Sequence, residues 1–380
     1  MGIRKRGKTW LVTVELGRDA ATGKRRRAYV TVASKRDAAR EEARLRHQAA
    51  TGLDLEPTRI TVAEYLQHWL DAVRPNLAPT TYLRYEGLLR HQVLPHIGVI
   101  RLSKLRPLHV QHLYARLHEA GRADGRGGLS PRTLLHVHRV LSEALEQAVR
   151  WQIVHRNVCQ AVEAPQPRRA EIRVLTPEQA RRLLEVAEAD DSVYGHAVIL
   201  ALLSGLRLGE LLGLTWQDVD LERGRVTVRR ALQHLASDGP VFREPKTARG
   251  HRTIPLGPSA VDALQRLRYR QMEKSLALAL AYRDRRLVFV SPQGTHLSGF
   301  ALRRAFYRLL LEAGLPRIRF HDLRHTHASL LLARGVHPKI VSERLGHASI
   351  AITLDIYSHV LPNLQEEAAR DLDVWLSGRP

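Results

Sequence analysis

Two short linkers constrain the fold more than any other feature, because they divide the chain into three segments of different character. Residues 51–58 combine glycine, proline and threonine, and residues 165–169 hold two prolines and two arginines. Glycine and proline interrupt helices and strands, so such stretches mark loops. The sequence therefore predicts three domains, at residues 1–52, 59–163 and 172–375.

The first segment predicts a three-stranded sheet backed by one helix. β-Branched and aromatic residues are concentrated in residues 9–16 and 28–32, and Ser34 is a candidate N-cap for a helix that runs to about residue 48. Three consecutive arginines precede the second strand run: Arg25, Arg26 and Arg27. Because a β-ribbon fits the major groove of DNA, we predict that these arginines bind DNA, although a solvated basic hairpin has the same pattern.

The second segment predicts a helical domain. Thr61 and Glu64 have the T-x-x-E spacing of a capping box, and Pro131 is suited to the first turn of a later helix. Apolar residues recur at helical spacing after Pro131 and predict one buried face. Arg132 and Arg139 lie largely off that face. They can contact phosphates or simply be solvated, and the sequence leaves both interpretations open.

The third segment predicts a mostly helical domain with a small antiparallel sheet. Thr176 and Pro177 signal its first helix, whereas residues 225–229 and 253–256 have the pattern of short strands. The expected fold class is therefore mainly α with small β-sheets, and the third domain is α+β.

The charge of the chain indicates a polyanionic partner. Its formal net charge is +22 and its sequence pI is about 10.9, values typical of proteins that bind nucleic acid. Cys159 is the lone cysteine, which excludes an internal disulfide and a cysteine metal site and predicts a cytoplasmic protein. No run of about 18 apolar residues occurs, so we expect no membrane span and no membrane partner.

Six polar residues scattered over the third segment have the side chains that chemistry on a phosphodiester requires. They are Arg207, Lys246, His321, Arg324, His347 and Tyr357. Guanidinium groups match phosphate oxygens bidentately, histidine and lysine transfer protons, and a tyrosine hydroxyl can act as a nucleophile. Together these residue types predict covalent chemistry on nucleic acid.

The local sequence indicates how several of these side chains are presented. Glycines flank Arg207, which predicts a helix junction there, and Glu210 lies three residues on, where it can buttress the arginine. Lys246 is expected at the tip of a hairpin between the two short strands. His347 follows a glycine that is expected to end a helix.

The run from His321 to His325 also permits a metal interpretation. Its two histidines stand four residues apart, as the ligands of zinc proteases do. Three features oppose this interpretation. Asp322 is a methylene shorter than the glutamate of those sites, Arg324 places a positive charge between the histidines, and no third ligand follows at the expected spacing. A metal phosphohydrolase needs further upstream ligands that we cannot place. We therefore expect no metal and no cofactor.

Taken in order, the six residues resemble the signature of the tyrosine recombinase (phage integrase) family. The matching motifs are Arg207, Lys246, the H-x-x-R of His321 and Arg324, the L-G-H that ends at His347, and Tyr357. The match covers the third segment motif by motif. The first two segments look like the arm-binding and core-binding domains of that family, with weaker motif support.

The resemblance implies a reaction in which Tyr357 attacks a DNA phosphate, giving a 3′-phosphotyrosyl link and a free 5′-hydroxyl. It further implies that two arginines hold the phosphate, with roles for the remaining side chains as follows: His321 as proton acceptor or phosphate donor, His347 as hydrogen-bond donor, Lys246 as proton donor to the leaving oxygen, and Glu210 as the group that orients the site.

The resemblance also implies partners. These are double-stranded DNA at core and arm attachment sites, three further copies of the chain in a homotetramer, and DNA-bending or directionality proteins. The expected function is integration and excision of a mobile element or prophage. The amphipathic stretch 364–376 can pack on its own domain or on a neighbouring copy, and the sequence does not decide between them.

Other functions share parts of the pattern. A type IB topoisomerase uses the same chemistry but relaxes supercoils without pairing two duplexes. A recombinase that resolves chromosome dimers lacks the extra N-terminal domain. A non-catalytic DNA-binding regulator explains the charge, but it does not explain the ordered set of residues around Tyr357.

Overall fold

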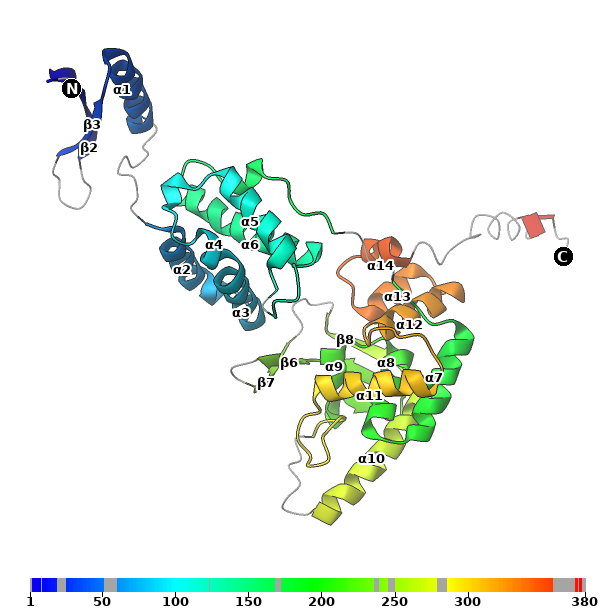
Figure 1. The fold of residues 1–380 in the computed structure, drawn as a ribbon. Coiled ribbons are helices and arrows are strands. Elements are labelled where there is room, and N and C mark those ends of the chain that lie inside the picture. The colour runs from blue at the N-terminus through cyan, green and yellow to red at the C-terminus, as the bar shows by residue number, and fades with distance from the viewer. Residues whose placement is uncertain are drawn as a thin grey trace. The chain divides into compact units, whose positions relative to one another are not determined.

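The computed structural model describes residues 2–7, 9–18, 25–50, 60–122, 124–167, 172–235, 239–244, 250–278, 286–357, 373–374 and 376–377. The chain splits into two compact units, Met1–Arg169 and Ala170–Pro380 (Figure 1). Within the described residues, no helix is long and apolar enough to cross a bilayer. The predicted fold class, mainly α with small sheets, is confirmed.

The chain begins with the predicted three-stranded sheet and helix. The antiparallel strands are β1 (Gly2–Arg6), β2 (Thr9–Arg18) and β3 (Arg25–Val32), followed by α1 (Lys35–Ala50). Alternate residues of β2 face the helix, so Val12 and Val14 are buried against Ala38 of α1. Ser34 caps the helix as predicted, since its Oγ accepts the Asp37 backbone N–H at 3.1 Å.

The rest of the first unit is helical. Its α-helices are α2 (Val62–Val73), α3 (Pro79–Leu88), α4 (Leu94–Ile97), α5 (Pro107–Ala120) and α6 (Pro131–Arg150), with short turns η1 (Arg74–Asn76), η2 (Leu89–Val93), η3 (Leu102–Lys104) and η4 (Val158–Ala161). The predicted capping box starts α2, because the side chains of Thr61 and Glu64 each accept the other's backbone N–H.

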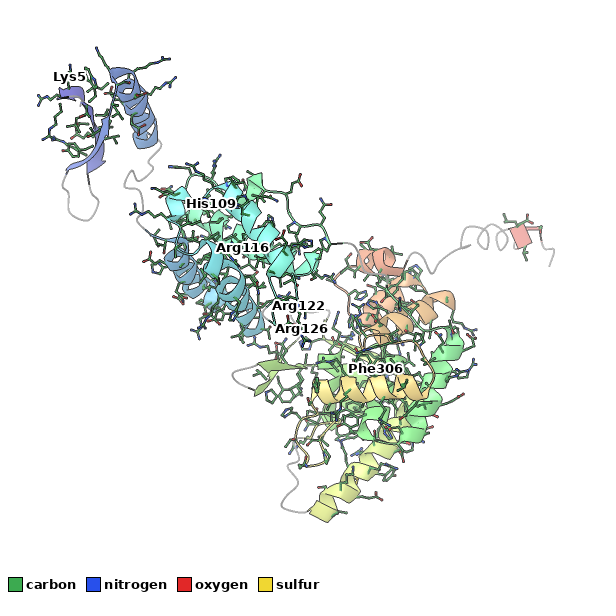
Figure 2. All side chains as sticks on the ribbon, in the orientation of Figure 1. Lys5, His109, Arg116, Arg122, Arg126 and Phe306 are labelled. Carbon is green, nitrogen blue, oxygen red and sulfur yellow. The ribbon has the colours of Figure 1, made fainter. Side chains whose placement is uncertain are left out.

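Aromatic side chains tie these helices together. Trp69 of α2 stacks on Tyr85 of α3, and the buried hydroxyl of Tyr65 donates to the Ala144 carbonyl of α6 at 2.5 Å. Basic side chains such as Arg116 and Arg126 are exposed on the same domain (Figure 2). The helical domain therefore combines an apolar core with a charged exterior.

The second unit contains eight α-helices among its described residues: α7 (Pro177–Asp190), α8 (Val193–Ser204), α9 (Leu208–Leu212), α10 (Pro258–Leu278), α11 (Gly299–Glu312), α12 (Asp322–Ala333), α13 (Pro338–Leu345) and α14 (Ile350–Tyr357). α8 is apolar around nearly its whole circumference, so it lies at the centre and packs against α7, α10, α11 and α12. The loop at its C-terminal end is thereby held on a rigid support.

Two small antiparallel sheets complete the second unit. Strands β4 (Val219–Asp220), β5 (Arg225–Val228) and β8 (Arg252–Pro255) form one, and β6 (Ala231–Leu235) and β7 (Gly239–Arg243) form the other, with η5 (Trp216–Asp218) before β4. Both predicted strands are present and pair directly. The expectation of a simple hairpin between them is wrong, because the β6–β7 ribbon occupies that connection.

Candidate active site

Arg207 lies in the turn between α8 and α9, at the predicted helix junction. α8 ends at Gly205, whose φ of 68° is left-handed. A Cβ at this position would lie 2.8 Å from side-chain atoms of both His327 and Leu345, so only glycine fits the turn. Arg207 is then the N-cap of α9.

Glu210 buttresses Arg207, as the sequence predicted, and it also holds a second arginine. Its carboxylate accepts the backbone N–H of Arg207 at 3.0 Å and Nη1 of Arg207 at 2.7 Å. Arg252, at the start of β8, donates to both oxygens of the same carboxylate at 3.2 and 2.8 Å. Burial alone would raise the pKa of Glu210, but the hydrogen bond and charge of Arg252, together with Arg207, lower it to about 2.

Arg324 is the buried centre of the site. Its side chain projects from α12 and donates to two backbone carbonyls, Gly205 at 2.8 Å and Leu345 at 2.5 Å. Burial and then the charge of Arg207 lower the pKa of Arg324 to about 9, so it remains protonated at neutral pH. One guanidinium thus joins the turn that carries Arg207 to the end of α13.

The turn after α13 presents His347. Gly346 caps α13 in the left-handed conformation, as predicted, and its carbonyl accepts Nη2 of Arg207 at 3.3 Å. Nδ1 of His347 lies 2.8 Å from the hydroxyl of Thr353. Burial, followed by the charges of Arg324 and Arg207, lowers the pKa of His347 to about 3. When Thr353 donates this hydrogen bond, Nε2 carries the ring proton and can donate to an anion.

His321 is the exposed N-cap of α12, three residues before Arg324. Its ring meets that of His325 edge-on, with centroids 5.0 Å apart and an interplanar angle of 90°. Partial burial and the charge of Arg324 lower the pKa of His321. The ring is therefore placed to act as a neutral donor or acceptor beside the arginines.

Tyr357 ends α14 with its hydroxyl hydrogen-bonded to His325. The distance from Tyr357 Oη to His325 Nδ1 is 2.7 Å. The tyrosine is 1% exposed and packs on α12 and α13 next to Leu332, Val341 and Leu345. Burial raises the pKa of Tyr357 to about 12, although the charge of Arg324 opposes the rise.

The geometry of the histidine run does not favour zinc. His325 directs Nδ1 at Tyr357, and Asp322 is occupied by Arg319, whose Nη2 lies 2.7 Å from Oδ1. Within the described residues, no group of three or more His, Cys, Asp or Glu side chains could hold a metal ion. In the sequence, His325 was singled out only within the metal interpretation that we rejected; in the structure it contacts Tyr357.

Several predicted residues lie away from this cluster or outside the described residues. Lys246 lies outside them, and so do the side chains of Arg25 and Arg26, although their backbone forms part of β3. Arg27 is exposed on β3. Arg132 and Arg139 are exposed on α6, where burial and the charges of Arg84 and these two arginines lower the pKa of His136.

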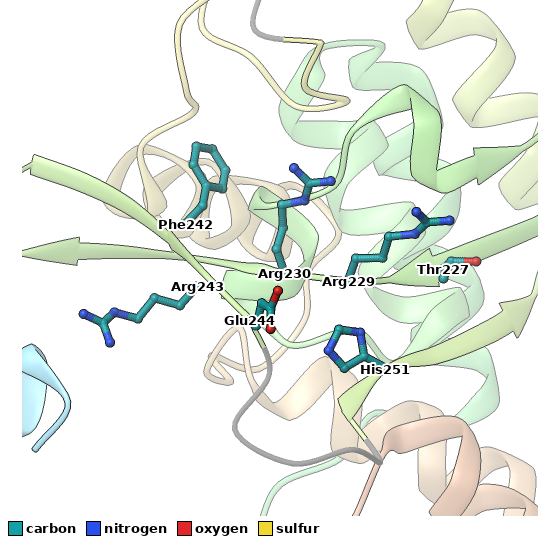
Figure 3. Close-up of a pocket in the computed structure, with 7 residues that line it drawn as sticks. All are labelled: Thr227, Arg229, Arg230, Phe242, Arg243, Glu244 and His251. Carbon is teal, nitrogen blue, oxygen red and sulfur yellow. The ribbon is translucent and has the colours of Figure 1, made fainter. Parts of the chain in front are cut away.

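A basic pocket of 640 Å³ opens at the two sheets of the second unit (Figure 3). It is lined by Thr227, Arg229, Arg230, Phe242, Arg243, Glu244 and His251. His251 also lines a second groove, of 530 Å³, which reaches Arg252 and His347. The two cavities share His251, so they adjoin each other between the sheets and the turn that carries His347.

The structure brings together Arg207, Glu210, Arg324, His321 and His347, and it connects Tyr357 to them through His325. Sequence reasoning missed Arg252 and the contact of His325. Arg252 stands 42 residues from Glu210, and His325 stands 32 residues from Tyr357. Spacing rules relate residues only a few positions apart, so they could not predict these contacts. The sequence showed only that His325 follows Arg324 directly.

Comparisons of sequence give one family. The phage integrase family model matches residues 173–363, and the model of the phage integrase N-terminal SAM-like domain matches residues 61–118. An integrase of Streptomyces ambofaciens is 31% identical, with 94% of this chain and 92% of that protein covered. A tyrosine recombinase XerC-like protein of Caldanaerobacter subterraneus subsp. tengcongensis is 29% identical, with 97% of each chain covered.

Comparisons of structure give the same fold. The integrase of transposon Tn1549, in complex with a circular intermediate DNA, has a TM-score of 0.68 at 22% identity, with 82% of this chain and 99% of that chain covered. A lambda integrase tetramer bound to a Holliday junction has a TM-score of 0.55 at 18% identity, with 91% and 95% covered.

Proposed function

The chain belongs to the phage integrase family and is a tyrosine site-specific recombinase, and on that premise we propose that Tyr357 cleaves and rejoins DNA to integrate and excise a mobile element or prophage. The observation that carries this proposal is the double hydrogen bond of Arg324. Because these two bonds link Arg324 to the carbonyls of Gly205 and Leu345, residues from three segments of the chain lie around one guanidinium group.

In the proposed reaction, the phosphate to be cut binds between Arg207 and Arg324. Both guanidinium groups are held by protein oxygens before DNA arrives, so little reorganisation is needed as charge develops on the phosphate. His347 and His321 donate further hydrogen bonds to its oxygens, and Glu210 orients Arg207. Two fixed arginines supply the charge that a metal ion supplies in other phosphoryl-transfer sites.

Attack by Tyr357 Oη on phosphorus forms a 3′-phosphotyrosyl bond and releases a 5′-oxygen, to which Lys246 gives a proton. A phenol, with an ordinary pKa near 10, is a better leaving group than an alkyl alcohol. The covalent intermediate therefore keeps the energy of the phosphodiester bond. A 5′-hydroxyl from a second duplex reverses the step and completes strand exchange without ATP.

The partners proposed for this chain follow from the reaction. Exchange between two duplexes requires four cuts, so four copies of the chain act together on double-stranded DNA. Two solved integrases of similar fold are complexes with DNA, and one of these is a tetramer bound to a Holliday junction. Exposed arginines on α6 support contact with core sites, and Arg25, Arg26 and Arg27 of β3 support contact with arm sites.

The three regions of residues 1–52, 59–163 and 172–375 then serve as arm-binding, core-binding and catalytic domains. The match of the SAM-like domain model to residues 61–118 supports the second of these assignments. One chain that binds two kinds of site would be assisted by proteins that bend DNA or set the direction of exchange. A recombinase of this kind acts on DNA in the cytoplasm.

Replacement of Tyr357 by phenylalanine tests the proposal directly. The probe is a duplex that carries the DNA flanking this gene, nicked beside the scissile phosphate so that cleavage traps a covalent adduct. Wild-type protein should form the adduct in EDTA, and Tyr357→Phe should bind the duplex equally well and form none. An adduct with Tyr357→Phe would remove Tyr357 from its role. Relaxation of plasmids that lack the flanking sequence would instead favour a topoisomerase.

A further inference from the structure

His325 is the hydrogen-bond partner of the Tyr357 hydroxyl among the described residues. Its Nδ1 lies 2.7 Å from Oη, and the two rings are tilted by 56° with centroids 5.7 Å apart. His321, the histidine of the family motif, contacts His325 edge-on. The family signature therefore does not identify the histidine that meets the nucleophile.

The burial of Tyr357 means that its proton must pass to the protein. The side chain is 1% exposed, and burial raises its pKa to about 12, so neither bulk water nor spontaneous ionisation at neutral pH provides a phenolate. A phenol that attacks phosphorus has to lose its proton as the new bond forms. An acceptor within hydrogen-bond reach is thus required, and geometry is the first criterion for such a group.

His325 is also fixed in position and neutral before DNA binds, but its lowered pKa makes it a weak base until the phosphate is bound. It is 8% exposed on α12, and its ring is held between the Tyr357 hydroxyl and the edge-on ring of His321. Burial and the neighbouring His321 lower its pKa to about 4, which keeps the ring neutral and leaves a nitrogen lone pair free at neutral pH.

Building on the proposed function, we propose that His325 accepts the phenolic proton of Tyr357 during cleavage and returns it during rejoining. In cleavage, the proton moves from Tyr357 Oη to Nδ1 of His325, the Oη–P bond forms and the P–O5′ bond breaks, with the 5′-oxygen protonated by Lys246. In rejoining, the 5′-hydroxyl returns its proton to Lys246 and attacks phosphorus, the Oη–P bond breaks, and His325 gives its proton back to the phenolate.

The nearby arginine makes this transfer easier. Arg324 is close enough for its charge to lower the pKa of Tyr357, and in the proposed reaction the bound phosphate brings negative charge next to the Tyr357 oxygen. A proton on His325 is therefore compensated when the phosphate is bound. Without DNA, the cations around the ring disfavour that proton, which keeps the acceptor ready.

The test uses the nicked duplex described above, with single-turnover adduct formation as the measurement. His325→Asn keeps a hydrogen-bonding group near the position of Nδ1 but cannot accept a proton, so the rate of adduct formation should fall by roughly 10²–10⁴-fold, the range of general base catalysis. The rate of adduct formation by His325→Ala should fall by a similar factor, and added imidazole should restore part of it.

The rescue distinguishes proton transfer from packing. With a series of substituted imidazoles of similar size, the rescued rate of His325→Ala should rise with the pKa of the added base, as proton acceptance requires. His327→Ala removes a histidine of similar burial that contacts the Leu202 carbonyl and Arg344, so imidazole should give it no pKa-dependent rescue.

Several outcomes would overturn the inference. A normal rate for His325→Asn would mean that the histidine serves only as a hydrogen-bond partner of Tyr357. Rescue of His325→Ala that is independent of base strength would mean that the histidine serves only to fill space. Faster adduct formation by His325→Ala would mean that the contact restrains Tyr357. In each case wild-type protein still forms the adduct and Tyr357→Phe does not, so the proposed function would survive.

Discussion

The arginines of the second unit and those of the helical domain differ in how firmly they are held. Arg324 is buried and the side chain of Arg252 is 7% exposed, and each donates to protein oxygens that fix its guanidinium. Arg132 and Arg139 are exposed on α6 and lie near other positive groups. Both sets are basic, but only the first is fixed by acceptors before any DNA binds.

The difference suggests that the two sets of arginines have different roles, one in the reaction and the other in DNA affinity. A buried, hydrogen-bonded cation stabilises the charge that develops at one atom, because it is already in position and needs no reorganisation when the reaction occurs. An exposed cation adds affinity through release of counterions from DNA, and that contribution depends on salt and little on geometry. Substitutions that keep charge but change shape should therefore damage the first set and spare the second.

Among substitutions that keep the charge of an arginine, Arg324→Lys should have the largest effect. Lysine keeps the positive charge but cannot donate to Gly205 and Leu345 while also facing a phosphate, because it lacks the planar fork of arginine. We expect adduct formation to slow by about 10²–10³-fold, comparable to the loss of one fixed donor in other sites. DNA binding, measured by a gel-shift titration, should change little.

The matched control for this substitution is Arg139→Lys. It makes the same chemical change at an exposed position of α6, so neither the cleavage rate nor the affinity should move measurably. If Arg324→Lys cleaved as fast as Arg139→Lys, the fixed geometry of the buried arginine would be irrelevant and the comparison would fail.

Arg252→Met should have an intermediate effect, on both stability and rate. It leaves Glu210 buried with Arg207 as its remaining charged partner, and breaking a buried ion pair costs about 3 kcal/mol of unfolding free energy. Because Arg207 loses part of its support, we expect cleavage to slow by roughly tenfold, equivalent to about 1.4 kcal/mol. Arg225→Met, at an exposed position of β5, is the control and should be close to neutral.

The pH dependence of unfolding gives a second measurement for this variant. The pKa of Glu210 is lowered from 4.5 to about 2 in the folded protein. A lowered carboxylate pKa stabilises the fold above pH 4.5, and that stability is lost as pH falls from 4.5 through 2. Denaturant titrations between pH 3 and 7 should show a smaller acid loss for Arg252→Met than for wild type. An equal loss would exclude Arg252 as the cause.

Features that depend on a few neighbouring residues were predictable from sequence. The capping box at Thr61, the caps at Thr176 and Ser34 and the glycine before His347 each involve partners within about three residues, and all are present in the structure. Hydrophobic periodicity and β-branched runs likewise predicted the helical character of the chain and the strands β2, β3, β5 and β8.

Features that depend on distant pairing were not predictable. The strand β6 (Ala231–Leu235) contains no β-branched or aromatic residue, so its sequence carries no strand signal and its pairing with β7 sets its structure. The clamp of Arg252 on Glu210 and the contact of His325 with Tyr357 join separate elements. A single sequence identifies such residues as polar, and only the packing of the helices determines which partner each one meets.

Neutralising the exposed arginines should have the smallest effect, and it should act on DNA binding alone. Arg132→Gln and Arg139→Gln should each weaken DNA binding only a few-fold at moderate salt, and each should lower the slope of log affinity against log salt by about one. The cleavage rate of bound DNA should stay unchanged, because neither side chain belongs to the cluster around Arg324.

Arg150→Gln, exposed at the other end of α6, is the matched control and should leave the salt slope as it is. A lower rate of cleavage at saturating protein would mean that the exposed arginines also take part in the chemistry, and the division between fixed and solvated charge would no longer hold.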